Sequence, residues 1–417
     1  MPTAPAPHRH VAVVGAGMAG LCTAWFLQEQ GIGVTVLERT AVAAGASAGN
    51  AGWVTPALVA PLPDPVILRE GLRAVMSRSA AVYLPRLPGP GLLAFLARFT
   101  LNCTPRRWEA GLAALALLSR GALSAFDELA GGGAGAPVVS APVLAAYPSA
   151  GRRGPLLAEL AAIKAAGGAA ADFEVLDGPA AAAAEPILTR VTQAAVRIHG
   201  QRYLDPGAFT AALAASVRQR GGQIRTGVTV RSVHDDGRQV LVSEPAGEAG
   251  YDAVVLATGA WLGRLASRLG VRTAIQPGRG YSFAVPARRL PAGPVYLPAQ
   301  RLACTPLPGG RLRVAGVMEF RPADAPLDHG RVARIADGLP ALLAGVDPGA
   351  RQDEWVGARP CTPDGLPVIG RTRSARIFVA GGHGMWGITL GPVTGRLLAG
   401  LVTGRPAPEL RPFDPLR

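Results

Sequence analysis

The order of apolar and polar positions at the start of the chain predicts a strand–helix–strand unit. The run from His10 to Val14 is apolar, residues 18–30 have apolar positions at helical spacing, and residues 34–37 are again apolar. Short valine-rich runs that alternate with longer helical stretches are typical of parallel strands joined by helical crossovers. Gly31 and Gly33 separate the helix from the second strand, as expected of a residue that commonly ends helices.

The same alternation returns later in the chain. Apolar strands are expected at residues 194–198, 223–233, 253–261 and 376–380, and helices at residues 207–220 and 389–401. Residues 66–130 are mainly helical, with helices at 91–101 and 110–129, whereas residues 277–318 predict sheet with a hairpin turn at 308–310. Smaller elements are expected as strands near Val138 and Val143 and as helices at 155–166, 180–185 and 330–343.

Three glycines between the first strand and its helix form the pattern G-x-G-x-x-G. Gly15 permits a tight turn, Gly17 leaves the backbone open to a pyrophosphate, and Gly20 lets the helix pack close to the strand. Glu38 follows Gly15 by 23 residues, near the roughly 20 expected for an acid that binds a ribose 2′-hydroxyl. A carboxylate there would repel a 2′-phosphate. Strand, glycines, helix, strand and acid occur in the required order, so the stretch predicts an adenine dinucleotide, either NAD or FAD.

These patterns together predict an α/β fold with a Rossmann-type domain assembled from separated segments, residues 1–65, 193–270 and 355–417. An α+β domain with a mixed or antiparallel sheet would comprise residues 66–192 and 271–354. The chain has 417 residues and 49% hydrophobic content, which is enough for two structural domains.

Several stretches of small residues are candidates for close contact with a flat ring system or a pyrophosphate. Residues 43–52 lack large side chains, although an ordinary flexible loop is the alternative, and the strand at 253–261 contains Thr-Gly. The glycine loop at 381–387 precedes the last helix. The candidate cofactor-binding residues are Gly15, Ala16, Gly17, Met18, Ala19, Gly20, Glu38, Arg39, Ser47, Asn50, Ala51, Gly52, Val230, Thr258, Gly259, Gly384, Met385, Trp386, Gly387, Ile388 and Thr389.

The charge balance is strongly basic without a basic patch. Lys+Arg is 42 and Asp+Glu is 28, a formal charge of +14, but Lys164 is the one lysine and the arginines are scattered. This pattern favours compositional bias over a nucleic-acid footprint. A positive field would still assist an anionic cofactor, a carboxylate substrate or contact with a membrane surface.

Cysteine and histidine spacing points to neither a metal site nor a disulfide framework. The four cysteines contain no C-x-x-C, and the six histidines have no metal-ligand spacing. The first ten residues lack an apolar signal region, and no apolar run reaches the roughly 18 residues of a membrane span. We expect a cytoplasmic protein, with association at the inner face of the membrane left open.

Several motifs in order resemble the FAD-dependent D-amino acid oxidase and dehydrogenase superfamily, which includes glycine oxidase. They are the glycine motif with Glu38, Tyr203-Leu-Asp-Pro, Val255-Leu-Ala-Thr-Gly-Ala, Gly357-Ala-Arg-Pro-Cys-Thr-Pro-Asp-Gly-Leu-Pro-Val-Ile-Gly370 and Gly382-His-Gly-Met-Trp-Gly-Ile-Thr389. Gly49-Asn-Ala-Gly-Trp-Val-Thr-Pro56 and Asn102-Cys-Thr-Pro105 look most like the bacterial D-amino acid dehydrogenase branch. The resemblance covers nearly the whole chain.

The resemblance implies FAD and hydride transfer from the substrate α-carbon to the flavin. The product is an imino acid, which water converts to a 2-oxo acid and ammonia. D-amino acids are the expected substrates; glycine, sarcosine, a proline derivative, an opine or a specialised-metabolite amine are the alternatives. The chain has no second strand-linked G-x-G-x-x-G for NAD(P), so oxygen, a quinone or a protein carrier should accept the electrons.

The resemblance also implies one site residue, and three more are candidates by their type and their place in the predicted elements. Arg359 matches the arginine that holds the substrate carboxylate, for which a planar guanidinium is well suited. Tyr281 and Tyr296 are candidates for a hydroxyl contact or stacking, with core packing as the alternative. His383 is a candidate for contact with the flavin or the pocket, with loop shaping as the alternative. No general base is assigned.

Two departures concern the cofactor bond and the substrate contacts. Cys361 and Cys304 are the cysteines to consider for covalent flavin, but no motif supports a bond, so non-covalent FAD is expected. Arg279 stands where the resemblance leads us to expect lysine, which puts fine substrate contacts in doubt.

Two rival interpretations remain. An RNA-binding flavoprotein would need a basic stripe with exposed aromatics, and 5% aromatic content argues against it. A peripheral membrane protein that passes electrons to quinone would need an apolar or amphipathic patch, for which residues 85–118 are the candidate region.

Overall fold

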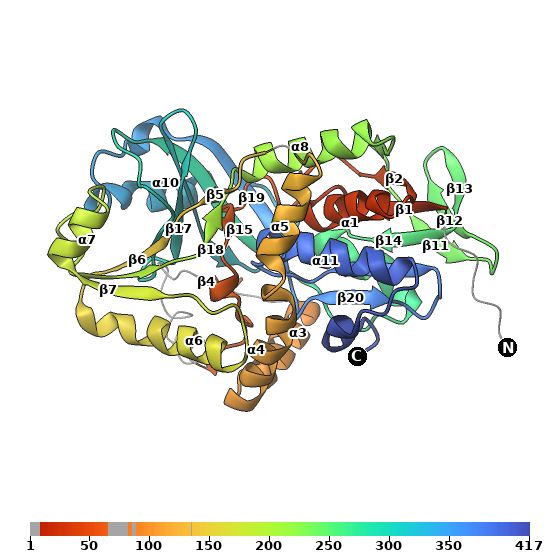
Figure 1. Cartoon of the computed structure of the whole chain (residues 1–417), viewed down its shortest axis with the longest axis horizontal. Helices are drawn as coiled ribbons and strands as arrows, with labels where there is room; N and C mark the ends of the chain where they lie inside the picture. The colour runs from red at the N-terminus through yellow and green to blue at the C-terminus, as the bar shows by residue number, and fades with distance from the viewer. Residues whose placement is uncertain (1–8, 66–81, 86–88, 135) are drawn as a thin grey trace.

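The computed structural model describes residues 9–65, 82–85, 89–134 and 136–417 (Figure 1). The first part of the predicted helical region, residues 66–81, lies outside the described residues. The described chain forms two α/β parts placed side by side along the longest axis of the molecule, each built on its own large sheet.

The first part is a six-stranded sheet with the strand order β10-β2-β1-β14-β21-β20. All neighbouring strands are parallel except β20 and β21, which are antiparallel. The strands are β1 (His10–Val14), β2 (Gly33–Leu37), β10 (Gln223–Arg225), β14 (Ala253–Leu256), β20 (Val368–Arg371) and β21 (Ile377–Gly381). Segments from the start, middle and end of the chain therefore share one sheet, as the sequence predicts.

Helices cover this sheet and bury most of its apolar surface. They are α1 (Met18–Glu29), α4 (Pro105–Ser119), α5 (Ala122–Gly131), α8 (Pro206–Gln219), α9 (Leu262–Ala266) and α11 (Gly387–Val402). α1 packs along α11, where a Cβ on Gly395 would lie 2.6 Å from the backbone of Cys22. Phe126 and Leu129 of α5 join the same core cluster. The region assigned to the second domain thus contributes helices to the core of the first.

The second part is built on a nine-stranded sheet with the order β19-β15-β18-β17-β16-β6-β8-β7, to which β4 adds beside β18. Its strands are β4 (Val82–Tyr83), β6 (Val143–Tyr147), β7 (Phe173–Asp177), β8 (Ala194–Ile198), β15 (Gln276–Pro286), β16 (Val295–Leu297), β17 (Leu302–Leu307), β18 (Arg311–Glu319) and β19 (Gln352–Cys361). Most neighbouring strands are antiparallel, with two parallel pairs. The associated helices are α3 (Pro90–Asn102), α6 (Gly154–Ala165), α7 (Gly178–Ala184) and α10 (His329–Asp337).

Strand membership departs from the expected division of the chain at two points. β8 and β19 belong to the nine-stranded sheet, although both were assigned to the dinucleotide-binding domain. A separate antiparallel sheet of β11 (Ser232–Asp235), β12 (Val240–Glu244) and β13 (Gly247–Tyr251) was largely missed. Much of β11 and β13 is exposed or half-buried, so these strands lack the continuous apolar run that marks a buried strand.

A small third sheet is formed by short strands from distant segments of the chain. β3 (Trp53–Val54), β9 (Arg202–Tyr203) and β5 (Val139–Ser140) form a short sheet next to the small-residue loop.

The helical stretch Pro105–Gly131 is long and apolar enough to span a bilayer by composition, with a mean hydropathy of 1.2, but half of it is buried inside the protein. Its contacts with α11 explain this apolar character as core packing.

Candidate active site

The glycine turn after β1 packs more closely than any side chain would allow. Gly15 has φ +111°, and a Cβ there would lie 2.5 Å from the carbonyl oxygen of Ala257. A Cβ on Gly20 would lie 2.0 Å from the carbonyl oxygen of Gly15. These two glycines bring β1, α1 and β14 together, as the motif predicts.

The amino end of α1 remains open at Gly17. A Cβ on this residue would meet only Ser47 Oγ, at 3.4 Å, and no side chain caps the helix from this position. The Glu38 carboxylate accepts hydrogen bonds from the backbone N–H of Ala16 at 2.9 Å and of Thr40 at 3.0 Å. Ser47 Oγ accepts from the N–H of Met18 at 3.1 Å. An anion can therefore approach the helix end, with an acid nearby for a ribose hydroxyl.

The end of β14 supplies further groups that fit a bound dinucleotide. Thr258 Oγ1 and Trp261 Nε1 are buried without a hydrogen-bond partner among the described residues. Buried polar groups normally have partners, so these two are suited to a ligand. The Arg39 guanidinium lies over the Trp261 ring at 4.4 Å and pairs with Asp324 at 3.7 Å. Together with the glycine turn, these groups fit FAD.

The remaining cofactor candidates divide into contact positions and packing positions. Gly259 has φ +57° at the end of β14, and Val230 is half-buried against the neighbouring apolar cluster. Ala19 and Ile388 pack in the core of the six-stranded part. Any contact of Ile388 with a cofactor would therefore come from its backbone.

The small-residue loop at 43–52 is held against the nine-stranded sheet by three side chains. Ser282 Oγ donates to the carbonyl of Gly49, Thr305 Oγ1 to that of Ala51, and Arg313 Nη1 to that of Ala48, at 2.7, 2.7 and 2.8 Å. The loop also closes on itself, because Asn50 Oδ1 accepts from the N–H of Gly52 at 2.9 Å. The loop is fixed between the two large sheets.

A cavity of about 1090 Å³ lies next to this loop. Its wall includes Gly49, Asn50 and Ala51 from the loop and Met385, Trp386 and Thr389 from the region of the last helix. Arg359, Tyr281 and Tyr296 also line it. The structure therefore brings the predicted flavin-side residues and three of the four predicted catalytic residues to one cavity, a size typical of small-molecule sites.

Arg359 lies on the cavity wall together with Arg152 and Arg301. Its Nη1 donates to the carbonyl of Val317 at 2.7 Å, and no carboxylate pairs with it among the described residues. The guanidinium rests against Gly280, where a Cβ would lie 2.1 Å from Nη2. Enclosure by the cavity walls lowers the pKa of Arg359 from its usual value, although an arginine stays protonated. A half-buried cation without a counter-charge suits a carboxylate ligand.

Tyr281 lines the cavity, but its hydroxyl is bonded to a neighbouring carboxylate. Successive side chains in a strand point to opposite faces, so Tyr281 and the neighbouring Ser282 face opposite sides of β15. The Tyr281 hydroxyl donates to Glu319 Oε2 at 2.7 Å. Burial and Glu319 raise the pKa of the Tyr281 phenol to about 12. The Tyr281 hydroxyl, a candidate for contact with a substrate, is thus already bonded to Glu319.

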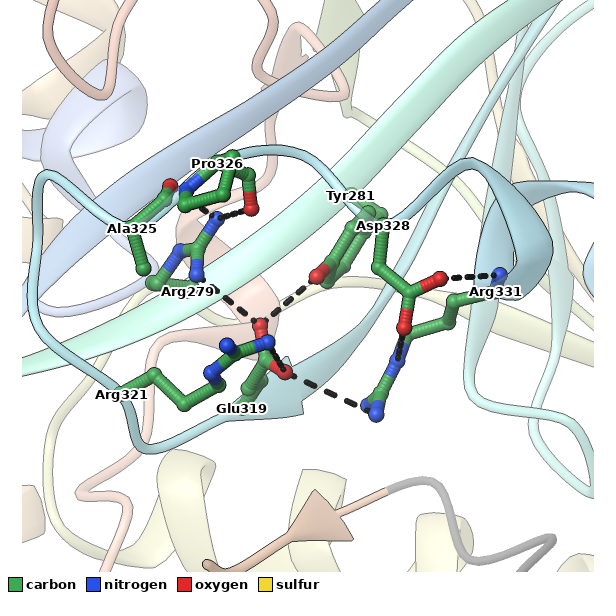
Figure 2. Close-up of polar contacts among 8 residues, drawn as sticks. All are labelled: Arg279, Tyr281, Glu319, Arg321, Ala325, Pro326, Asp328 and Arg331. Atoms are coloured by element: carbon green, nitrogen blue, oxygen red, sulfur yellow. Dashed lines mark hydrogen bonds and ion pairs between the residues drawn. The ribbon is translucent and has the colours of Figure 1, made fainter.

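The buried Glu319 carboxylate lies at the centre of a cluster of three arginines (Figure 2). Arg279 Nη1 lies 3.3 Å from its carboxylate, and both side chains are fully buried. Arg321 and Arg331 approach the other carboxylate oxygen at 3.4 and 3.6 Å. Arg279 also donates to the carbonyls of Ala325 and Pro326. The arginine found where lysine was expected is therefore a packing cation on the far face of β15.

Tyr296 and the tail residues form the aromatic part of the cavity wall. Tyr296 meets Trp53 edge to face, with ring centroids 5.8 Å apart. Trp386 Nε1 donates to the carbonyl of Ala60 at 2.8 Å, and Thr389 Oγ1 donates to that of Trp53 at 3.0 Å. These bonds fix the glycine loop and the start of α11 against the segment that follows the small-residue loop.

His383 does not line this cavity. The ring is buried, and its Nε2 lies 3.0 Å from Thr394 Oγ1 in α11. Burial lowers the pKa of His383 to about 4, so the imidazole is neutral near pH 7. This placement favours the loop-shaping alternative over contact with the pocket.

The cysteines are poorly placed for a covalent flavin bond. Cys22, Cys103, Cys304 and Cys361 are all free and buried. Burial raises the pKa of Cys361 to about 11 and that of Cys304 to about 12. Because the thiolate is the nucleophile, these protonated thiols agree with non-covalent FAD.

Many of the residues that line the cavity were not predicted from the sequence, and Glu159, Tyr147 and Trp355 are among them. Trp355 covers the loop backbone, since a Cβ on Gly49 would lie 2.0 Å from its ring. Glu159 lies within helix α6 and Tyr147 ends β6, far from every motif. The sequence signal for Glu159 is an acid between the buried Leu156 and Leu160, a weak indication by itself.

The glycine turn and the cavity beside the small-residue loop are those of a dinucleotide-binding protein with room for a second, small ligand. Residues 10–401 match the family described as FAD dependent oxidoreductase, and the chain belongs to this family. It is therefore an FAD-dependent enzyme, as the motifs predict.

Similar proteins span the whole chain. The D-amino acid dehydrogenase of Methylobacterium nodulans is 35% identical over 427 residues, which cover 97% of each chain. That of Cereibacter sphaeroides is 32% identical, covering 97% of this chain and 94% of the relative. The glycine oxidase structure from Geobacillus kaustophilus has a TM-score of 0.73 at 24% identity, covering 98% of this chain and 99% of that one. This structural likeness shows the fold.

Proposed function

We propose that the protein oxidises the Cα–N bond of small D-amino acids to imino acids, which water converts to 2-oxo acids and ammonia. The observation that carries this proposal is Arg359, a half-buried cation with no carboxylate partner among the described residues, on the wall of a cavity beside the flavin-side loop. The similarity over the full chain to proteins named D-amino acid dehydrogenase supports the choice of substrate.

In this proposal each part of the cavity has a separate role. FAD, when bound, supplies the hydride acceptor. Arg359 holds the substrate carboxylate and so directs the α-carbon, because a guanidinium can donate two parallel hydrogen bonds. Met385, Trp355 and Trp386 cover the site and exclude water. The raised pKa of Tyr281 keeps its phenol protonated, which argues against this residue as a base.

Glycine, sarcosine and other small amines remain the alternative substrates, since an anchored carboxylate is common to several of them. Anaerobic bleaching of the flavin absorbance by D- and L-alanine, glycine and sarcosine separates these possibilities. We expect rapid bleaching by D-alanine. Loss of an interaction made by a buried charged group predicts that Arg359→Ala raises the substrate Kd on the order of 100-fold.

The matched control for Arg359→Ala is Arg98→Ala, which removes an exposed arginine of α3. Arg98→Ala should leave the bleaching rate unchanged. A yellow protein that is bleached by sarcosine or glycine but by no D-amino acid would defeat the assignment. If Arg359→Ala and Arg98→Ala change bleaching to the same extent, Arg359 does not bind the substrate.

We further propose that a membrane quinone accepts the electrons. Helix α3 lines the cavity through Phe95, Leu96 and Phe99. Its outer face exposes Leu93 and Leu101, which are 52% and 65% exposed. Arginines next to exposed apolar groups favour contact with an anionic bilayer surface, and such contact would place the protein at the inner face of the membrane.

The double change Leu93→Ser and Leu101→Ser tests this contact. It should weaken sedimentation with anionic vesicles and slow reduction of a long-chain quinone embedded in them. Reduction of a soluble dye by the same variant should be unchanged. Rapid turnover with oxygen in the absence of vesicles would overturn the quinone proposal.

A further inference from the structure

Helix α6 carries an unpaired acid into the cavity. Arg152, Pro155, Leu156 and Glu159 all line the cavity, at the spacing that places residues on one face of a helical stretch. Leu160 and Ile163 are buried and hold the helix in place. Glu159 therefore reaches the cavity from a rigid element.

The Glu159 carboxylate has no hydrogen-bond or ion-pair partner among the described residues. Burial and the nearby charge of Asp64 raise the pKa of Glu159 to about 7. A half-buried carboxylate without a donor is unfavourable. A cation placed beside it would relieve that cost and return the group to its charged form.

The surroundings of Glu159 favour an organic cation. Tyr147 lies within electrostatic range of both Tyr296 and Glu159, and these interactions add to the burial that raises the pKa of Tyr147. Tyr147, Tyr296 and Trp53 belong to the apolar cluster beside α6. Aromatic faces next to a carboxylate are suited to ammonium and guanidinium groups.

Among the described residues, the other charged side chains on the cavity wall are Asp64, Arg152 and Arg301. Asp64 and Arg301 each have a partner. Arg152 is exposed and would be the competing site for a substrate with a second carboxylate. Glu159 is less exposed than Arg152. The cavity therefore favours a substrate side chain that ends in a cation over one that ends in a second carboxylate.

Arg359 and Glu159 belong to different elements of the cavity wall. Arg359 is on β19 of the nine-stranded sheet, whereas Glu159 is on α6, which lies along one margin of the molecule in Figure 1. Because both side chains line the same cavity, a substrate bound at both would have its carboxylate at Arg359 and its distal group at Glu159.

We propose that Glu159, together with Tyr147 and Tyr296, forms a subsite for the distal cation of a substrate side chain, so that the enzyme favours D-amino acids ending in an ammonium or guanidinium group. This inference rests on the proposed function. It names Glu159 as a specificity determinant that acts on the side chain and not on the α-carbon.

The test compares D-lysine with D-norleucine, which lacks the distal ammonium. The ratio of their kcat/KM values isolates the contribution of that group. In Glu159→Gln the ratio should fall on the order of tenfold or more, the loss expected for a charge-assisted contact in an enclosed site. D-norleucine turnover itself should change less than about twofold. The exposed Glu109→Gln is the matched control and should leave the ratio unchanged.

A pH series gives a second readout. The ratio should rise with pH through the pKa of Glu159, about 7, because the carboxylate must lose its proton to hold a cation. The α-amine is common to both substrates, so its titration cancels. In Glu159→Gln the ratio should be independent of pH.

Binding of unreactive ligands separates this inference from the proposed function. The flavin absorbance reports binding of valerate and of 5-aminovalerate without turnover. 5-Aminovalerate should bind more tightly to the wild-type protein, and the difference should vanish in Glu159→Gln. If no D-amino acid bleaches the flavin, the proposed function fails and this pair of ligands still decides the subsite.

The subsite proposal is overturned if valerate and 5-aminovalerate bind with equal affinity. It is also overturned if Glu159→Gln lowers kcat/KM by the same factor for D-lysine and for D-norleucine. A preference for D-glutamate over D-lysine would also overturn it in favour of Arg152. Flavin content and Tm of the variant, measured first, establish that the folded holoenzyme is compared.

Discussion

The guanidinium of Arg359 occupies the space beside Gly280 where a side chain would begin. A Cβ on Gly280 would lie 2.1 Å from Nη2 and 2.2 Å from Cζ of Arg359. β15 and β19 are neighbouring antiparallel strands in which Gly278 is the direct partner of Arg359. The absence of a side chain on β15 thus sets where the proposed carboxylate anchor lies.

Gly280→Ala should move the anchor without unfolding the protein. The clashing atoms are the end of a flexible side chain, so the guanidinium can shift at little cost to stability. We expect the Kd of a carboxylate substrate to rise on the order of tenfold, measured by titration of the flavin absorbance. Gly263→Ala, where a Cβ would meet nothing within 4 Å, is the control. Unchanged binding in Gly280→Ala would mean that Arg359 does not hold the substrate.

Gly17→Ala should separate cofactor binding from folding. Its Cβ would make a single contact, at 3.4 Å from Ser47 Oγ, so the apoprotein should keep its Tm. The methyl group would stand where the pyrophosphate approaches the backbone, and FAD affinity should fall at least about tenfold. Fluorescence titration with FAD measures this. Full flavin content in Gly17→Ala would argue against the expected position of the phosphates.

Gly20→Ala is the contrasting change, because its Cβ would lie 2.0 Å from the backbone oxygen of Gly15. Since backbone cannot move aside as a side chain end can, Gly20→Ala should lower stability as well as FAD content. Urea unfolding of the two apoproteins compares them directly.

Glu319→Gln should destabilise the nine-stranded part. The change leaves the fully buried Arg279 without its counter-charge, and removal of one partner of a buried ion pair costs about 3–5 kcal/mol. The free energy of unfolding from urea titration measures the loss. Tyr281→Phe removes only the hydrogen bond to Glu319 and should cost about 1 kcal/mol. Equal stability of Glu319→Gln and wild type would show that the cluster adds no net stability.

Stability should fall in mild acid because of His383. The ordinary pKa of the group is 6.5 and burial lowers it to about 4 in the folded protein, so the unfolded chain binds the proton more readily. The resulting stability is present above the unfolded pKa and is lost as pH falls toward 4, by roughly 2–4 kcal/mol. His383→Gln should show a shallower loss of Tm between pH 6.5 and 4 than wild type. If the Tm of His383→Gln and of wild type falls equally between pH 6.5 and 4, His383 is not the cause of the acid sensitivity.

The cofactor end of the protein was largely determined by local sequence. Gly15, Gly17, Gly20 and Glu38 act within about thirty residues of chain, and each acts through backbone geometry or a nearby amide. Such constraints are visible in a linear pattern. The strands and helices of the six-stranded part were predicted for the same reason, since their apolar runs are long and periodic.

The cavity was decided by tertiary structure. Arg359 and Glu159 are 200 positions apart and meet one cavity only because β19 and α6 pack around it. The Tyr281 hydroxyl bonds Glu319 across the pair of strands β15 and β18, whose register shifts between Arg279 and Tyr281. The sequence by itself determined the class of enzyme and its cofactor, because backbone turns are local. Only the tertiary structure decided which side chains line the cavity, because that depends on the pairing of strands distant in the chain.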